Sequence, residues 1–214
     1  MSDVAAVSDP WLRLRRALAG TAEEGPRPMS RLELPRVLER LLYAGGLARL
    51  RPAAVLVPLI ERAPAPTILL TRRADTLRSH SGQISFPGGR RDETDRDFTA
   101  AALREAQEEV GIEPSAVEVL GYLEDYPTLT GYRITPVVGR VSGPFEPRID
   151  PAEVAEVFEL PLARLLEEGA FARQTLLRDG LRLPFYELHH GGHRIWGATA
   201  GILWNLRCRL LNEC

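Results

Sequence analysis

The sequence contains no lysine, only two cysteines and no long apolar run. Two cysteines, Cys208 and Cys214, cannot form a disulfide framework or a four-ligand zinc site, so we expect a reducing compartment. The most apolar stretch, residues 53–60, is too short to cross a bilayer. Because lysine is absent, any strong side-chain contact with a phosphate has to come from an arginine guanidinium rather than an ammonium group.

The chain also carries little net charge. Its 27 basic and 29 acidic residues leave a formal charge of −2, so no general attraction to nucleic acid or to an anionic membrane is expected. The first ten residues hold neither a basic start nor an apolar run, which argues against a secretory signal. These features predict a cytoplasmic protein without a nucleic-acid or membrane partner, and they leave both a monomer and a homodimer open.

The 214 residues, 44% of them hydrophobic, are typical of a globular domain. Helices are expected from Pro10 onward and over 34–42, 98–110, 162–168 and 199–211, and strands over 53–60, 67–70, 117–123, 134–141, 154–160 and 185–188. Helices and strands in mixed order, without a strict βαβ repeat, favour an α+β fold with a mixed β-sheet covered by helices. We expect residues 1–49 to form a helical N-terminal extension and residues 50–214 the main domain.

The helix expected over 98–110 combines an apolar and an acidic face. Its apolar side chains at 103, 106 and 110 are three and four residues apart and share one face. Glu105, Glu108 and Glu109 have the same spacing and lie on the other face, and Arg104 can pair with Glu108 one turn away. Two interpretations are open, a solvated acidic surface or an oxygen-rich site for Mg²⁺ or Mn²⁺.

The residues around this helix favour the second interpretation. Gly89, Asp95 and the run REAQEEVGI at 104–112 closely resemble the Nudix box, whose usual form is G-x5-E-x7-R-E-U-x-E-E-x-G-U with U aliphatic. The chain departs from this pattern in three ways. Asp95 stands where Glu is usual, one extra residue precedes Arg104, and Ala106 fills the first aliphatic position.

A second pattern lies just upstream of the box. Residues 69–89 fit L-L-T-x-R-[SA]-x3-R-x3-G-x3-F-P-G-G at every specified position, which is the signature of the coenzyme A pyrophosphatases within the Nudix family. The longer box, and the segments 153–162 and 194–200, also resemble this subgroup. The resemblance runs from about residue 50 to the C-terminal helix and implies a Nudix-type α/β/α sandwich that splits coenzyme A into 3′,5′-ADP and 4′-phosphopantetheine.

The resemblance also implies roles for individual residues. Glu105 and Glu109 would ligate Mg²⁺ or Mn²⁺, with Glu108 completing the cluster, and Arg104 would orient the carboxylates. A backbone carbonyl of Gly88 or Gly89 would add a ligand, because only glycine permits so close an approach of the backbone. Glu153 is our choice for the base that activates water, and Glu105 is the alternative.

Arginines and histidines outside the box have competing interpretations. Arg73 and Arg78, fixed positions of the coenzyme A signature, either contact substrate phosphate or form salt bridges within the fold. His189, His190 and His193 resemble a metal cluster, but Gly191-Gly192 between them is typical of a hairpin turn.

Two other functions remain open. One is a Nudix hydrolase of ADP-ribose, NADH or an RNA cap, which would need no coenzyme A signature. The other is a ligand-sensing Nudix module that binds without hydrolysis, and such modules usually lack one or more of the box carboxylates, which this chain retains.

Overall fold

A computed structural model describes residues 9–23, 40, 46–77, 80–178 and 180–212. Its centre is an eight-stranded mixed sheet in which β1 and β7 are parallel and the other described pairs are antiparallel. The strands are β1 (Arg51–Ile60), β2 (Thr67–Arg73), β3 (Ile84–Ser85), β4 (Gly88–Arg90), β5 (Val117–Tyr122), β6 (Tyr126–Pro127), β7 (Tyr132–Val141) and β8 (Val154–Pro161).

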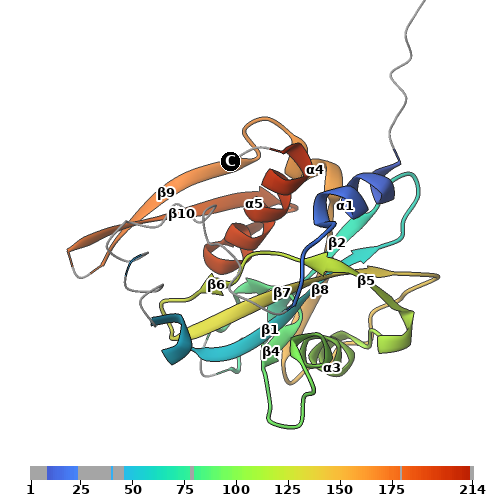
Figure 1. The fold of residues 1–214 in the computed structure, drawn as a ribbon, viewed down its shortest axis with the longest axis horizontal. Coiled ribbons are helices and arrows are strands. Elements are labelled where there is room, and N and C mark those ends of the chain that lie inside the picture. Colours follow the sequence, from blue (N-terminus) through green and yellow to red (C-terminus); the bar gives the residue numbers. More distant parts are fainter. Residues whose placement is uncertain (1–8, 24–39, 41–45, 78–79, 179, 213–214) are drawn as a thin grey trace, which may run out of the picture.

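Helices cover both faces of this sheet (Figure 1). The helix α3 (Phe98–Val110) packs on one face, and α1 (Pro10–Leu18), α4 (Leu162–Leu166) and α5 (Gly197–Leu211) pack on the other. Side chains of β1 alternate between the two cores, because successive residues of a strand point to opposite faces. Ala54 and Leu56 lie in the core beneath α3, and Val57 and Leu59 lie in the core beneath α5. The expected α/β/α sandwich with a mixed sheet is therefore confirmed.

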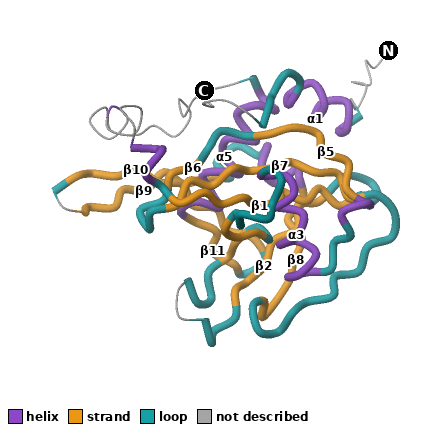
Figure 2. The backbone as a smooth tube through the Cα atoms, turned by 60° about the horizontal axis from the view of Figure 1, so that its bottom comes forward, coloured by secondary structure: helices purple, strands orange, loops and turns teal. Residues whose placement is uncertain are grey.

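A smaller antiparallel sheet follows the main one in sequence. It contains β9 (Phe171–Arg178), β10 (Leu181–His190) and β11 (His193–Trp196), and the β9–β10 hairpin extends away from the sandwich (Figures 1 and 2). At its base the ring of Tyr186 stacks on Trp204 of α5 at a centroid distance of 4.2 Å. Only the short strand 185–188 was expected here, so β9 and β11 are additions that the sequence pattern did not predict.

Other expectations agree with the structure more closely. The helix α3 spans 98–110 as expected, α5 begins two residues earlier and α4 ends two residues earlier. Gly88 and Gly89, expected to end a strand-like segment and to begin the loop before the acidic helix, form β4 with Arg90 and pair with Val55 and Ala54 of β1. Most of the helix expected over 34–42 lies outside the described residues.

The N-terminal helix shares the core of the main domain. Leu14 and Leu18 of α1 are almost fully buried and belong to the hydrophobic core beneath α5. Cys208, also on α5, is buried. No helix among the described residues is long and apolar enough to span a membrane.

Candidate active site

The helix α3 is fixed at both ends by its own sequence. Asp97 precedes the helix and accepts a hydrogen bond from the Ala100 N–H at 2.7 Å, and Gly111 ends it in the left-handed conformation at φ 73°. Between these ends, Ala101, Ala102 and Ala106 are fully buried against the sheet. Their small side chains let the helix lie close to β1, and this brings the carboxylates of its second half to the sheet.

Glu109 is the most unusual of these carboxylates. It is only 2% exposed, and its Oε2 has no hydrogen-bond partner among the described residues. Burial raises the pKa of Glu109 to about 8, and the charges of Glu105 and Glu153 act in the same direction. Arg73, whose Nη1 lies 3.8 Å from Oε1, and a backbone hydrogen bond from Gly88 lower the pKa but do not cancel the effect of burial. A buried carboxylate of this kind is costly unless a cation compensates it.

Glu105 lies one turn before Glu109 and rests against the backbone of β4. A Cβ atom added to Gly89 would stand 2.5 Å from both carboxylate oxygens of Glu105. At Gly88, φ is 155° and an added Cβ would stand 2.5 Å from the Ala54 carbonyl oxygen. Burial raises the pKa of Glu105, against the effect of Arg104. The glycine pair is therefore what lets β4 pass between β1 and this carboxylate.

Arg104 connects the acidic helix to the loop before it. Its Nε and Nη2 donate to the two carboxylate oxygens of Asp95 at 3.0 and 3.1 Å, a bidentate contact. Its Nη1 reaches Glu108 at 3.1 Å and Glu105 at 3.0 Å. The hydrogen bonds from Arg104 also lower the pKa of the 7%-exposed Asp95. The pairing with Glu108 is present as expected, but the main partner is Asp95, a box residue for which no such role was predicted.

Glu108 has a different environment from its neighbours. Its side chain is 59% exposed and contacts Arg104, so it lies at the rim of the site rather than against the sheet. The three box carboxylates therefore do not form one solvated face. The burial of Glu109 could have been read from its spacing, because Ala102, Ala106 and Glu109 stand at i, i+4 and i+7 along one helical stripe.

Glu153 comes from the turn immediately before β8. Its backbone carbonyl accepts a hydrogen bond from the Ala74 N–H at 2.8 Å, which fixes the turn to the end of β2. Its charge raises the pKa values of both Glu105 and Glu109, so it faces the same region. The fold thus brings together an acid that is 44 residues away in sequence from Glu109.

The arginines and histidines considered outside the box lie in different parts of the structure. Arg73 lies at the site, where it contacts Glu109, whereas Arg78 falls outside the described residues. The histidines lie on the β10–β11 hairpin, whose turn at Gly191-Gly192 is confirmed by the pairing of His190 with His193. His193 stacks on Phe158 at 4.0 Å and lies 3.3 Å from Glu156, so it already has partners.

The site residues fit a divalent cation by their chemistry. They offer carboxylate oxygens, one of them buried without a partner, and their mutual repulsion would be relieved by added positive charge. Within the described residues, no three histidine, cysteine or acidic side chains already converge as a ready metal site.

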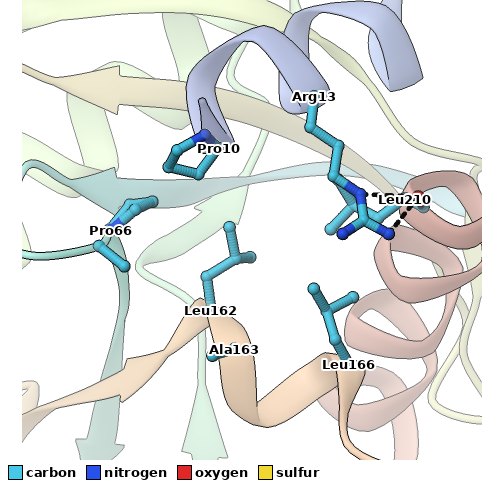
Figure 3. A pocket seen from close by; sticks show the side chains of 8 residues that line it. Pro10, Arg13, Pro66, Leu162, Ala163, Leu166 and Leu210 are labelled. Carbon is cyan, nitrogen blue, oxygen red and sulfur yellow. Dashed lines mark hydrogen bonds between the residues drawn. The ribbon is translucent and has the colours of Figure 1, made fainter. Parts of the chain in front are cut away.

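A cavity of roughly 110 Å³ lies elsewhere, between α1, α4 and the end of α5 (Figure 3). Its lining is mainly apolar and includes Pro10, Pro66, Leu162, Leu166 and Leu210. Arg13 closes one side by donating two hydrogen bonds to the Leu210 carbonyl at 2.9 and 3.1 Å. This cavity lies on the sheet face opposite α3 and contains none of the predicted site residues.

Comparison with known proteins gives the family context. A model of the NUDIX domain matches residues 50–179. A relative from Escherichia coli O1:K1, with the name "Uncharacterized Nudix hydrolase NudL", is 46% identical over 164 residues, which are 75% of this chain and 83% of the relative. A protein of the same name from Cronobacter sakazakii is 46% identical over 160 residues, with the same coverage of both chains.

Two solved structures show a more distant likeness. A C. elegans Ap4A hydrolase binary complex has a TM-score of 0.45 at 20% identity, over 52% of this chain and 80% of that one. The NUDIX domain of Shewanella oneidensis NrtR complexed with ADP ribose has a TM-score of 0.42 at 22% identity, over 55% of this chain and 76% of that one.

Proposed function

Because the chain belongs to the Nudix hydrolase family, we propose that it cleaves the diphosphate bond of coenzyme A and of its acyl derivatives. Hydrolases of this family act on nucleoside diphosphate derivatives and generally depend on a divalent metal. The products would be 3′,5′-ADP and 4′-phosphopantetheine. The observation that carries the proposal is the buried carboxylate of Glu109, whose Oε2 has no hydrogen-bond partner among the described residues, on the helix that follows a complete coenzyme A signature at 69–89.

In this proposal the acidic helix holds the metal, Mg²⁺ or Mn²⁺. Glu105 and Glu109 are its direct carboxylate ligands, Glu108 completes the cluster from the rim, and a backbone carbonyl of Gly88 or Gly89 adds an uncharged oxygen. A divalent cation bound there would neutralise diphosphate charge and lower the pKa of a bound water. The buried position of Glu109 supports this assignment, since a cation would compensate its charge.

Other residues would orient these ligands and accept the proton of the attacking water. Arg104 holds Asp95, Glu105 and Glu108 with one guanidinium group, and so fixes the loop and the helix relative to each other. The Glu153 carboxylate would accept the proton of the attacking water, and Glu105 is the alternative acceptor. The effect of Glu153 on the pKa values of both helix carboxylates supports its presence at the site.

The substrate phosphates would be held by Arg73 and Arg78, and Gly88 and Gly89 would contribute backbone contacts. Arg73 already contacts Glu109 at 3.8 Å, so it stands where a diphosphate would approach the carboxylates. A guanidinium suits this task because it can bind phosphate through two parallel hydrogen bonds. Arg73 would thus neutralise Glu109 in the free protein and contact phosphate in the complex.

A substrate panel tests the proposal directly. Purified protein is incubated with Mg²⁺ or Mn²⁺ and coenzyme A, acetyl-CoA, ADP-ribose, NADH or a capped RNA, and the products are identified by mass. We expect two phosphomonoesters from coenzyme A at the highest kcat/KM of the panel. Faster cleavage of ADP-ribose, NADH or capped RNA would assign a different Nudix substrate, and binding without any product would indicate a sensing module. Release of free coenzyme A from acetyl-CoA, with the diphosphate intact, would contradict diphosphate hydrolysis.

The cytoplasmic location expected from the sequence is part of the same proposal. Cell fractionation, with the redox state of Cys208 followed by thiol labelling, tests it.

A further inference from the structure

Residues 9–23, which we call the N-terminal arm, are joined to the main domain by several independent contacts. Leu14 and Leu18 are buried in the core, and the Arg13 guanidinium donates to the Leu210 carbonyl of α5. Arg15 forms an ion pair with Glu118 of β5, with its Nη2 2.8 Å from Oε2. The arm begins far upstream of residue 50, where the NUDIX match starts, so the family match does not account for its position.

Strand β5 has an irregular backbone at the point where the end of this arm contacts it. The Thr21 hydroxyl donates to the Leu18 carbonyl at 2.7 Å and accepts a hydrogen bond from the Tyr122 N–H at 3.0 Å. The neighbouring Gly121 has φ 152°, and a Cβ atom there would collide with the Thr21 hydroxyl. The register of β5 against β7 also shifts between Val119 and Gly121. A bulge and a glycine therefore stand where the arm crosses the strand.

Two residues later the arm reaches the first turn of α3. Glu23 accepts a hydrogen bond from the Thr99 N–H at 3.0 Å, and Thr99 is 76 residues away in sequence. The first N–H groups of a helix have no acceptor within the helix itself. Asp97 satisfies the N–H of Ala100, and Glu23 satisfies that of Thr99. A carboxylate at this end of a helix is also favoured by the helix dipole.

The Thr99 side chain strengthens the same junction. Its hydroxyl lies 2.8 Å from the Tyr122 hydroxyl, and both hydroxyls lie 3.4 Å from Oε2 of Glu23. The arm, β5 and α3 therefore meet in one hydrogen-bonded cluster. At the opposite end of α3, the N–H groups of Arg148 and Asp150 each donate at 3.0 Å to the carbonyls of Val110 and Glu109.

We propose that the N-terminal arm is a positioning element for the acidic helix, and that Glu23 is its decisive contact. A helix rises about 1.5 Å per residue, so Glu105 lies about 9 Å along the axis from Thr99. Fixing the first turn from outside sets the axial position and rotation of α3, and hence the placement of Glu105 and Glu109 over β4. The inference rests on the proposed function only in assigning the metal to these two carboxylates.

Three variants of the full chain test this role. Glu23→Ala removes the acceptor for Thr99, Glu23→Gln keeps an oxygen acceptor without the charge, and Arg15→Ala breaks the ion pair with Glu118 but leaves the junction at Thr99 intact. The readouts are amide hydrogen exchange of residues 98–102, Mn²⁺ affinity by electron paramagnetic resonance, melting temperature, and kcat and KM for coenzyme A.

For Glu23→Ala we expect exchange in the first turn of α3 to accelerate about fivefold to tenfold. We also expect Mn²⁺ to bind about threefold more weakly or worse, and kcat to fall with little change in KM. Glu23→Gln should keep α3 exchange, Mn²⁺ affinity and kcat close to the values of the unmodified protein. Arg15→Ala should lower the melting temperature without altering exchange in α3 or Mn²⁺ affinity.

The inference is overturned if Glu23→Ala changes only the melting temperature, or if Arg15→Ala weakens Mn²⁺ binding equally. Exchange and Mn²⁺ binding require no turnover, so they separate this inference from the choice of substrate. If the unmodified protein does not cleave coenzyme A and Glu23→Ala still loosens α3 and weakens Mn²⁺ binding, the substrate proposal fails and the positioning role stands. If the unmodified protein binds no Mn²⁺, both fail.

Discussion

The acidic helix α3 and the β10–β11 hairpin each place three candidate metal ligands within five residues of sequence, yet the fold treats them differently. On α3, Glu109 is buried with an oxygen that lacks a partner among the described residues, and burial disfavours its ionisation. On the hairpin, His189 contacts Glu187, and His193 contacts Glu156 and stacks on Phe158. The two clusters have the same spacing in sequence. Only the acidic cluster contains a buried charged group whose burial is not fully compensated, which is Glu109.

This difference gives a physical criterion for a cation site. A buried carboxylate whose charge is only partly compensated, as that of Glu109 is by Arg73, destabilises the folded chain, and such a residue persists where something else favours it, most simply a ligand. A histidine already bonded to a carboxylate and stacked on an aromatic ring has a structural explanation. Variants that act on one cluster and not on the other test the comparison.

The largest expected effect comes from Glu109→Gln. The amide keeps the size of the side chain but removes the anionic ligand, so kcat should fall about a thousandfold or more, equivalent to about 4 kcal/mol in the barrier. Glu108→Gln, one residue away and 59% exposed, is the matched control and should lose about tenfold or less. The measurement is kcat at saturating Mg²⁺ for both variants. Wild-type turnover in Glu109→Gln, or equal losses in the two variants, would contradict the assignment of the direct ligands.

A second effect concerns the stability of the metal-free protein. The pKa of Glu109 is about 8 in the folded state, above the ordinary value of 4.5. Between these values the folded chain retains a proton that the unfolded chain has lost, so this residue's contribution to stability falls as pH rises from about 4.5 to about 8. The loss would be on the order of a few kcal/mol.

Chemical denaturation of the metal-free protein across this pH range, compared with Glu109→Gln, isolates the contribution. The variant should be the more stable protein at pH 8 to 9 and should lack part of the pH dependence. Saturating Mg²⁺ should stabilise the unmodified protein most at high pH, because the ligand must be ionised to bind. If the free energy of unfolding of the two metal-free proteins depends on pH in the same way, burial does not raise the pKa of Glu109.

A third, smaller effect is expected at the substrate arginines. Arg78→Ala should lower kcat/KM for coenzyme A about tenfold, equivalent to about 1.4 kcal/mol, if its guanidinium holds a phosphate. If that phosphate is the 3′-phosphate, 3′-dephospho-coenzyme A should lose much less, because the contact is already missing. Equal losses on both substrates would assign Arg78 to the diphosphate or to the fold, and no loss on either would remove it from the site.

The sequence predicted α3 to the residue because its ends carry their own signals, Asp97 and Gly111. It did not predict β9, because residues 172–177 are all exposed and show no alternation of apolar and polar side chains. That strand depends on pairing with β10, a tertiary contact. Likewise, the sequence places Gly88-Gly89 at the end of a strand-like segment, but the pairing of these residues with β1 is a tertiary contact that the pattern does not specify.

The candidate site divides in the same way. The box pattern predicts roles for Glu105, Glu109 and Arg104 because their proposed chemistry depends on spacing within one helix. The contacts of Asp95 and Glu23 were not anticipated, since they join α3 to distant segments. Spacing along a helix is a local property that the sequence shows directly. The contact of Glu23 with Thr99, 76 residues away in sequence, depends on the tertiary fold.

The smallest expected effect comes from substitutions of the hairpin histidines. His189 is exposed, so His189→Ala combined with His190→Ala should leave Mn²⁺ affinity and kcat within about twofold of the unmodified protein. His193→Ala removes a ring stacked on Phe158 and should lower the melting temperature, again without changing Mn²⁺ affinity. Titration with Mn²⁺ and Zn²⁺ at pH 7.5, followed by calorimetry, measures both. Histidine prefers Zn²⁺ to Mn²⁺, so a Zn²⁺ signal that disappears in these variants would reveal a second metal site on the hairpin. Unchanged binding of both metals would mean that the hairpin histidines hold no metal, and that the contacts of His189 with Glu187 and of His193 with Glu156 are structural.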